Sequence, residues 1–146
     1  MRFIMMMIPA VYQPQGSGPK ATTGFTPDAD AVARMTRYNE ELAKSGAMLS
    51  GDGFMPPDAG ARITFPGGKP TVAQGPWPDA KDVVGGFWMI QAGSKEEAVE
   101  WARRVPCEEG DMIEVRQVFE VTDFPEDVQA AADSPVLREH LEKAKV

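Results

Sequence analysis

The pattern of hydrophobic and polar positions predicts strands that alternate with helices. Four apolar runs have the length and composition of strands, and they cover residues 2–8, 47–54, 86–92 and 112–118. The first run does not alternate with polar residues, so we expect that strand to be buried on both faces. Two shorter runs within residues 62–74 flank a Pro-Gly-Gly-Lys turn and predict an inserted hairpin.

Helical periodicity predicts two helices between these strands. The first helix has its apolar face at Ala31, Met35, Tyr38 and Leu42. We expect Thr26 to cap the start of this helix and Gly46 to end it. The second helix begins at a capping box formed by Ser94 and Glu97, and it ends near Pro106.

This order of elements indicates an α+β fold. Right-handed crossovers turn it into a ferredoxin-like β-α-β-β-α-β antiparallel sheet with both helices on one face, an inserted β-hairpin and a C-terminal helical tail. The tail is predicted to form two helices, over residues 125–132 and 135–145. We expect one domain at residues 1–120. Residues 121–146 are expected to form a C-terminal helical extension of the same domain. Because the other face of the sheet would be bare and apolar faces need cover, we expect a homodimer.

Composition and charge narrow the class of protein. The chain has 146 residues, of which 42% are hydrophobic and 25% charged, as in a globular domain that needs no disulfide or structural metal. The net charge is −7 and there is no basic stripe, so we expect neither a nucleic-acid partner nor binding to an anionic membrane. The apolar run at residues 2–8 is too short for a membrane span, and no signal-peptide cleavage site follows it.

The single thiol and the single imidazole give little support to catalysis. Cys107 is the only cysteine, which suits a reducing cytoplasm. We expect the adjacent Glu108 and Glu109 to raise the pKa of this thiol and oppose thiolate formation. His140, the only histidine, lies in the predicted tail and is expected at the surface. The sequence has no cluster of metal ligands and no phosphate-binding or dinucleotide-binding glycine motif, so we expect no metal and no cofactor.

Three stretches of the chain share a pattern with one known family. Residues 74–82 have the sequence QGPWPDAKD and are followed by VVGGFW at residues 83–88. Residues 50–57 have the sequence SGDGFMPP, and residues 97–102 have the sequence EAVEWA. In this order, these stretches resemble the YCII-related proteins, in particular their DGPF signature, D-G-P-F-A-E-T-K-E. We call residues 74–82 the signature loop.

The resemblance covers about residues 1–120 and implies a dimeric α/β barrel of ferredoxin-like subunits. It implies less about chemistry. Branches of the family that carry a His-Asp pair are suspected enzymes, and relatives with the same barrel architecture bind small aromatic or polyketide-like molecules. This chain departs from the pattern, because Gln74 stands where the signature has Asp and the histidine of the pair would fall near Met35. The His-Asp pair is therefore absent here.

Seven residues are candidates for a ligand pocket. They are Tyr38, Asp52, Trp77, Asp79, Lys81, Glu114 and Arg116. Glu114 and Arg116 are two residues apart on a strand, so they form a site if their face is covered and a surface pair if it is exposed. Trp77 either lines a cleft or belongs to a rigid turn that packs on a partner subunit. The long loop at residues 9–25 is either a lid or a disordered excursion.

Three functions are open from the sequence, one of which is a purely structural or protein-interaction role. The first is a small homodimeric module that binds a small organic molecule or acts as a regulator. The alternative is a cofactor-independent enzyme for proton transfer or elimination on a small aromatic or acidic substrate. In that case Asp79 or Asp52 would be the base, and Lys81 or Arg116 the electrostatic stabiliser. The lack of a metal cluster and of a histidine within the first 120 residues favours the binding module.

Overall fold

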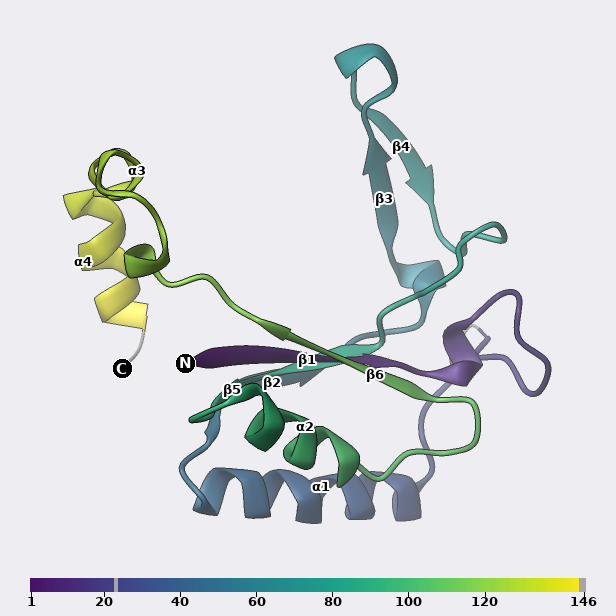
Figure 1. The fold of residues 1–146 in the computed structure, drawn as a ribbon. Coiled ribbons are helices and arrows are strands. Elements are labelled where there is room, and N and C mark those ends of the chain that lie inside the picture. The colour runs from purple at the N-terminus through teal and green to yellow at the C-terminus, as the bar shows by residue number, and fades with distance from the viewer. Residues whose placement is uncertain (23, 145–146) are drawn as a thin grey trace.

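A four-stranded sheet and two helices form the body of the molecule. The computed structural model describes residues 1–22 and 24–144. The strands are β1 (Arg2–Ile8), β2 (Met48–Gly53), β5 (Gly86–Gln91) and β6 (Met112–Gln117). Their order is β2-β5-β1-β6, and each neighbouring pair is antiparallel. The helices α1 (Ala29–Lys44) and α2 (Lys95–Arg103) lie together on one face of the sheet (Figure 1). This α+β architecture is compatible with a ferredoxin-like fold.

The start of α1 differs from the expectation by two residues. Asp28, and not Thr26, is the N-cap, because its carboxylate accepts a hydrogen bond from the backbone N–H of Ala31 at 2.8 Å. A carboxylate at this position also interacts favourably with the positive end of the helix dipole, which a neutral hydroxyl does not. At the other end, Gly46 has a φ of +80° and ends the helix as predicted.

The hydrophobic core lies between the sheet and the two helices. Its most deeply buried large side chains, each less than 2% exposed, are Phe3, Met5, Leu42 and Ile90. Tyr38 of α1 and Ala98 of α2 belong to the same cluster, as their helical spacing predicts. The helix-covered face of the sheet therefore buries the apolar stripes of both helices.

Among the described residues, no helix packs against the opposite face of the sheet (Figure 1). Phe3 and Met5 point toward the helices, so the alternating residues Ile4 and Met6 point the other way. Both of these residues are only partly buried. The structure thus differs from the expectation that β1 is buried on both faces, because a single copy of the chain covers only one of them.

Cross-strand pairing defines the residues of this second face. The residues of β5 and β6 that lie directly opposite Ile4 and Met6 share their face. They are Met89 and Phe87 on β5, and Arg116 and Glu114 on β6. We call the surface formed by Ile4, Met6, Phe87, Met89, Glu114 and Arg116 the open face.

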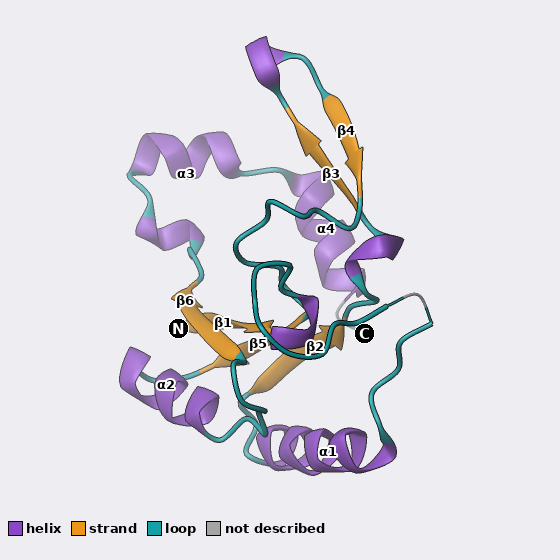
Figure 2. Cartoon of the chain, turned by 90° about the vertical axis from the view of Figure 1, so that its right-hand side faces the viewer, coloured by secondary structure: helices purple, strands orange, loops and turns teal. Residues whose placement is uncertain are grey.

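Two further segments project from the body on the side of the open face (Figures 1 and 2). The hairpin arm, residues 61–74, consists of β3 (Ala61–Thr64) and β4 (Thr71–Gln74), in agreement with the predicted insertion. The tail, residues 119–144, contains α3 (Glu126–Ala132) and α4 (Pro135–Ala144), as predicted. Lys145, the predicted end of the second tail helix, lies outside the described residues.

Candidate functional site

A cavity of about 300 Å³ lies at one edge of the sheet, between α1 and the strands β2 and β5. We call it the edge cavity. Besides glycines, its wall contains Met7, Met35, Asn39, Met48, Asp52, Phe87 and Trp88. Three of these seven side chains are thioethers, which are polarizable and adapt to irregular ligands. The cavity therefore has a largely apolar wall with a small number of polar groups, as small-molecule sites commonly do.

Helix α1 positions two of the lining side chains. Met35 and Asn39 are four residues apart, so they lie on the same side of the helix, one turn from each other. The side-chain oxygen of Asn39 accepts a hydrogen bond from the indole N–H of Trp88 at 2.8 Å. Because that bond engages the amide oxygen, the N–H groups of the amide are what Asn39 offers to a ligand.

Glycine brings β2 close to the indole of Trp88. A Cβ atom on Gly51 would lie 2.9 Å from the carbonyl oxygen of Phe87 and 3.1 Å from the Trp88 ring. A larger residue at this position would have to displace the strand or the indole. The register of β2 also shifts between Met48 and Ser50, an irregularity of the kind that often re-aims side chains beside binding sites.

Asp52 borders the edge cavity. It is exposed, and among the described residues that line the cavity it is the one ionisable group. Asp52 pairs directly with Phe87, so its side chain shares the open face, whereas Asn39 lies on the helix side of the sheet. Asn39 is therefore the polar side chain that could orient a molecule bound against the apolar wall. Within residues 1–22 and 24–144, no group of three or more His, Cys, Asp or Glu side chains could hold a metal ion.

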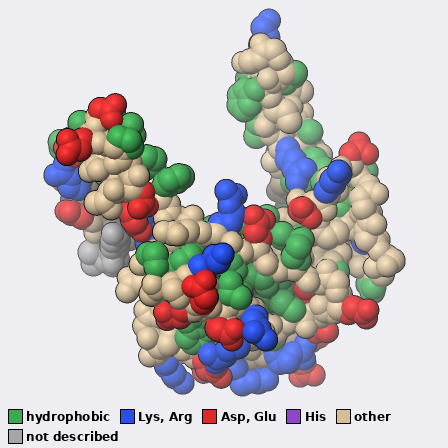
Figure 3. Space-filling model, in the orientation of Figure 1, with side chains coloured by type: hydrophobic (Ala, Val, Ile, Leu, Met, Phe, Trp, Pro, Cys, Tyr) green, Lys and Arg blue, Asp and Glu red, His purple; other side chains and the backbone are tan. Residues whose placement is uncertain are grey.

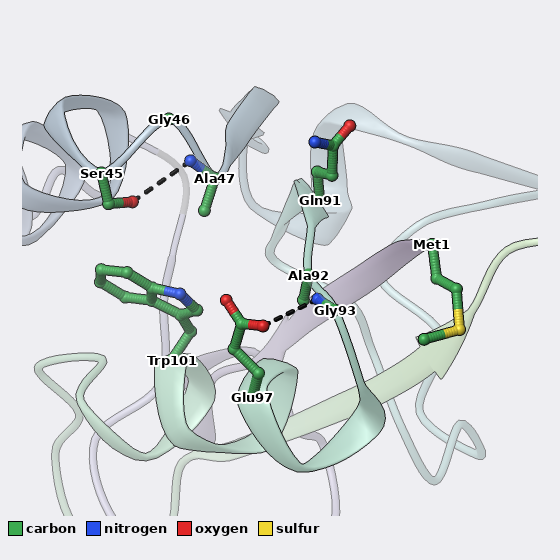
Figure 4. A pocket seen from close by; sticks show the side chains of 9 residues that line it. All are labelled: Met1, Ser45, Gly46, Ala47, Gln91, Ala92, Gly93, Glu97 and Trp101. Atoms are coloured by element: carbon green, nitrogen blue, oxygen red, sulfur yellow. Dashed lines mark hydrogen bonds between the residues drawn. The ribbon is translucent and has the colours of Figure 1, made fainter.

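A second cavity, of about 370 Å³, lies beyond the C-terminal end of α1 (Figure 4). The hydroxyl of Ser45 accepts a hydrogen bond from the backbone N–H of Ala47 at 3.2 Å. The carboxylate of Glu97 accepts one from the backbone N–H of Gly93 at 2.7 Å. The chain's own backbone thus engages these polar side chains, and the edge cavity is the stronger candidate for a ligand site.

Comparison with known families identifies the family of the chain. A model of the YCII-related domain matches residues 3–122. The chain belongs to the YCII-related family. No curated protein matches it. The matched region contains the sheet except for Arg2, the first residue of β1, together with α1, α2 and the hairpin arm, whereas α3 and α4 follow it.

In this YCII-related domain, Tyr38 lies in the core and does not line the edge cavity. Its side chain is 5% exposed, and its hydroxyl donates a hydrogen bond to the carbonyl oxygen of Trp101 at 3.0 Å. Its ring packs edge-on against the rings of Trp88 and Trp101. Burial raises the pKa of Tyr38 to about 12, although the positive charge of Arg104 opposes this rise.

The candidate residues of the signature loop lie at the base of the hairpin arm. The indole N–H of Trp77 donates a hydrogen bond to the carbonyl oxygen of Ala73 at 3.0 Å, and the guanidinium of Arg62 lies 4.4 Å from the ring centre. Trp77 therefore helps to hold the arm on the body. Asp79 and Lys81 are exposed, and neither lines the edge cavity.

The loop at residues 9–25, described without residue 23, packs against the signature loop and against the residues that follow the signature loop. The side-chain amide of Gln13 accepts a hydrogen bond from the backbone N–H of Val83 at 2.7 Å and donates one to its carbonyl oxygen at 2.8 Å. Gln15 donates a hydrogen bond to the carbonyl oxygen of Pro78 at 2.6 Å. None of these loop residues lines the edge cavity, so the loop acts as a brace for its neighbour in this structure.

Glu114 and Arg116 lie together on the open face, far from the edge cavity. Their charged groups are 3.9 Å apart and both side chains are largely exposed. They belong to β6, whereas Asp52 belongs to β2, and these strands are at opposite edges of the sheet. Three inter-strand spacings, roughly 14 Å, separate the two strands. The seven predicted residues are thus divided among the core, the edge cavity, the arm base and the open face.

Besides glycines, six residues of the cavity wall were not among the predicted ligand contacts. They are Met7, Met35, Asn39, Met48, Phe87 and Trp88. Asn39 carries a signal that could have identified it, because a polar side chain follows Tyr38 on the predicted apolar side of the helix. Trp88 carries another, because a buried indole N–H needs a hydrogen-bond acceptor.

The thiol and the imidazole both lie outside the edge cavity. Partial burial, with the neighbouring carboxylates of Asp111 and Glu108, raises the pKa of the Cys107 thiol. This rise has the predicted direction and opposes thiolate formation. His140 is exposed on α4, as expected. Among the helices that the structure describes, none is both long enough and apolar enough to cross a membrane.

Proposed function

We propose that the protein is a homodimeric module that binds a small organic molecule in the edge cavity. The observation that carries this proposal is the combination of three thioethers and an indole with the amide of Asn39 in one cavity wall. Apolar walls supply most of the binding free energy in such sites, and a few polar groups set the orientation of the ligand.

The chemistry of the wall indicates the class of ligand. A planar, polarizable molecule would make favourable contacts with the sulfur atoms of Met35 and Met48 and with the ring of Trp88. A hydrogen-bond acceptor on the ligand would meet the amide N–H groups of Asn39. The volume of about 300 Å³ is at the lower end for ligand sites and suits a molecule of one or two rings.

The open face supports the homodimer. Its centre is apolar, with Ile4, Met6, Phe87 and Met89 partly exposed in a single copy of the chain. A two-fold axis would pair this surface with itself, so that Glu114 of each subunit could face Arg116 of the other. Such a dimer would give the sheet the cover that its second face lacks.

The alternative function, proton transfer or elimination without a cofactor, has weaker support. Asp52 is the candidate base that borders the edge cavity, but it pairs with Phe87 and so shares the open face, away from Asn39 and Trp88. The proposed stabilisers do not accompany it, since Arg116 lies on the far edge of the sheet and Lys81 lies in the signature loop, outside the cavity wall. Asp79 is likewise outside the cavity. We therefore propose a binding function rather than a catalytic one.

We also infer a reducing, cytoplasmic location for the protein. The support is the single, exposed Cys107, which has no second cysteine to pair with inside the chain. The acidic net charge of −7 supports the prediction that neither nucleic acid nor an anionic membrane is a partner.

A cavity-filling variant tests the binding site. A library of small aromatic compounds would be screened for compounds that raise the melting temperature of the protein. We expect Met35→Trp, which fills the edge cavity, to abolish the stabilisation by any compound found. The matched control is Val32→Trp, on the same helix but 49% exposed and outside the cavity wall, and it should keep the effect. Stabilisation that survives in Met35→Trp would contradict the edge cavity as the site.

A further inference from the structure

The hairpin arm has an apolar face that remains exposed in the single chain. Ile63 pairs directly with Val72, and the two side chains are 52% and 59% exposed. Ala61 shares their face, whereas Arg62 and Thr64 lie on the other. An isolated two-stranded ribbon is marginally stable at best, so an arm of this kind gains stability when its apolar face is covered.

The tail also exposes apolar side chains. Leu137 and Leu141, one turn apart on α4, are 60% and 58% exposed. The tail is held to the body at its start, where the guanidinium of Arg2 makes two hydrogen bonds, of 2.7 and 3.1 Å, to the carboxylate of Glu120. Its position beside the beginning of β1 is therefore fixed by a bidentate contact.

The arm and the tail carry opposite charges. The arm has two basic side chains, Arg62 and Lys69, and no acidic one. The tail has seven acidic side chains and two basic ones, and both basic ones pair with acidic neighbours inside the tail. Figure 3 shows green patches with a blue tip on the arm, and red side chains among green ones on the tail. The two segments thus match in hydrophobicity and complement each other in charge.

We propose that the hairpin arm of each copy docks on the tail of a second copy in the homodimer. The arm is inserted next to the end of β1 and the tail starts next to its beginning, so the two segments rise from opposite ends of the open face (Figure 1). Consider a second copy whose open face packs against that of the first. If the two-fold axis lies in the plane of the sheets and is perpendicular to the strands, it exchanges the two ends of β1. This arrangement brings each arm beside the partner's tail.

Charge selects this arrangement over the other face-to-face packing. A two-fold axis in the plane of the sheets but parallel to the strands would place arm against arm and tail against tail. That packing would bring like charges together. The inference rests on the proposed homodimer and adds to it a second contact, outside the sheet. Because α3 and α4 follow the matched YCII-related region, the contact would depend on the tail, which lies outside that region.

Cross-linking of mixed dimers tests the proposal directly. Unlabelled protein and protein fully labelled with a heavy nitrogen isotope would be mixed, equilibrated and treated with a carbodiimide, which joins amines to adjacent carboxylates. We expect Lys69 to be joined to tail carboxylates in peptide pairs that contain one light and one heavy member. Dimers without such pairs would overturn the arm-to-tail contact and leave the sheet-face dimer intact. A monomer in sedimentation would overturn both.

Substitutions in the arm test its contribution to dimer strength. Ile63→Thr keeps a β-branched side chain, so the arm should persist while its apolar face is weakened. We expect the dimer dissociation constant to rise by about tenfold, since the contact occurs twice per dimer. The matched control is Val32→Thr, at an exposed position of α1 on the far side of the sheet, and it should leave the constant unchanged.

A charge reversal tests the electrostatic part. Lys69→Glu should weaken the dimer, and the weakening should shrink as salt is added, because salt screens exposed charges. Lys95→Glu on α2 makes the same change in net charge away from the open face and should have no comparable effect. An unchanged dissociation constant in both arm variants would overturn the proposal.

Discussion

The two faces of the sheet are built from alternate residues of the same strands, yet their environments differ. On the helix-covered face, Phe3 and Met5 are no more than 1% exposed. On the open face, the neighbouring Ile4 and Met6 are apolar as well but are only partly buried. The unbroken apolar run of β1 therefore supplies apolar side chains to both faces of the sheet, to the core on one side and to the proposed interface on the other.

The comparison teaches that hydrophobicity alone does not distinguish an internal core from an interface. The helix-covered face is apolar throughout its centre, with no charged residue in the core cluster. The open face places a Glu–Arg pair beside its apolar centre. Charged groups at the margin of an apolar patch are typical of protein–protein interfaces, where they favour one orientation of the partner.

Truncation of the helix-covered core should have the largest effect. Leu42 is fully buried on α1, so Leu42→Ala should lower the free energy of unfolding by about 2–5 kcal/mol through lost burial and the cavity left behind. Urea unfolding at fixed protein concentration measures this change. Val32→Ala, at an exposed position of the same helix, should change the stability by no more than about 0.5 kcal/mol. Equal losses in both variants would contradict the assignment of the core.

A charge in the open face should separate dimerisation from folding. Met6 lies opposite Phe87 and Glu114, so Met6→Glu places an unpaired carboxylate in the centre of the proposed interface and next to a like charge. We expect the dimer dissociation constant to rise at least about a hundredfold, since an unpaired buried charge costs several kcal/mol.

Sedimentation over a range of concentrations measures this constant, and circular dichroism checks that the variant is folded. Val32→Glu introduces the same charge on the side of α1 that faces solvent, and it should leave the dimer intact. A Met6→Glu protein that remains dimeric would show that the open face is not the interface.

Loss of the arm base should have a smaller and more local effect. Trp77 is half-buried between Ala73 and Arg62, so Trp77→Ala should cost about 1–2 kcal/mol, less than a fully buried tryptophan would. Hydrogen exchange should accelerate in residues 61–74 and remain slow in β1 and β5. Exchange that accelerates equally in the central strands would show that the arm base belongs to the global core.

The contrast between local and long-range structure explains how much of the fold and site could be predicted from sequence. Elements with one strongly apolar stripe, such as α1 and α2, were correctly predicted because local periodicity alone determines which side is buried. Of the seven predicted pocket residues only Asp52 borders the edge cavity, because the cavity wall joins β1, α1, β2 and β5, which are distant in the sequence. Local spacing and composition do not reveal which residues from distant parts of the sequence meet in the folded chain, so the other residues of this wall could not be predicted.

Burial of the Tyr38 hydroxyl predicts the smallest effect, one that depends on pH. Its pKa is raised from 10 to about 12 in the folded chain, because burial disfavours the charged phenolate. The unfolded chain therefore releases this proton at lower pH than the folded chain does. The stabilising contribution is complete below about pH 10 and is lost as the pH rises from 10 to about 12.

Tyr38→Phe removes both this proton and the hydrogen bond to Trp101. At neutral pH the variant should be less stable by about 1 kcal/mol, the usual net value of such a bond. Above pH 10 the difference should narrow, because only the parent protein then loses stability by releasing the phenol proton of Tyr38. Urea unfolding of both proteins across this range measures the difference, with Tyr12→Phe, whose hydroxyl bonds to Phe54 in a more exposed position, as the control. A difference that stayed constant up to about pH 12 would mean that Tyr38 is not held neutral by the core.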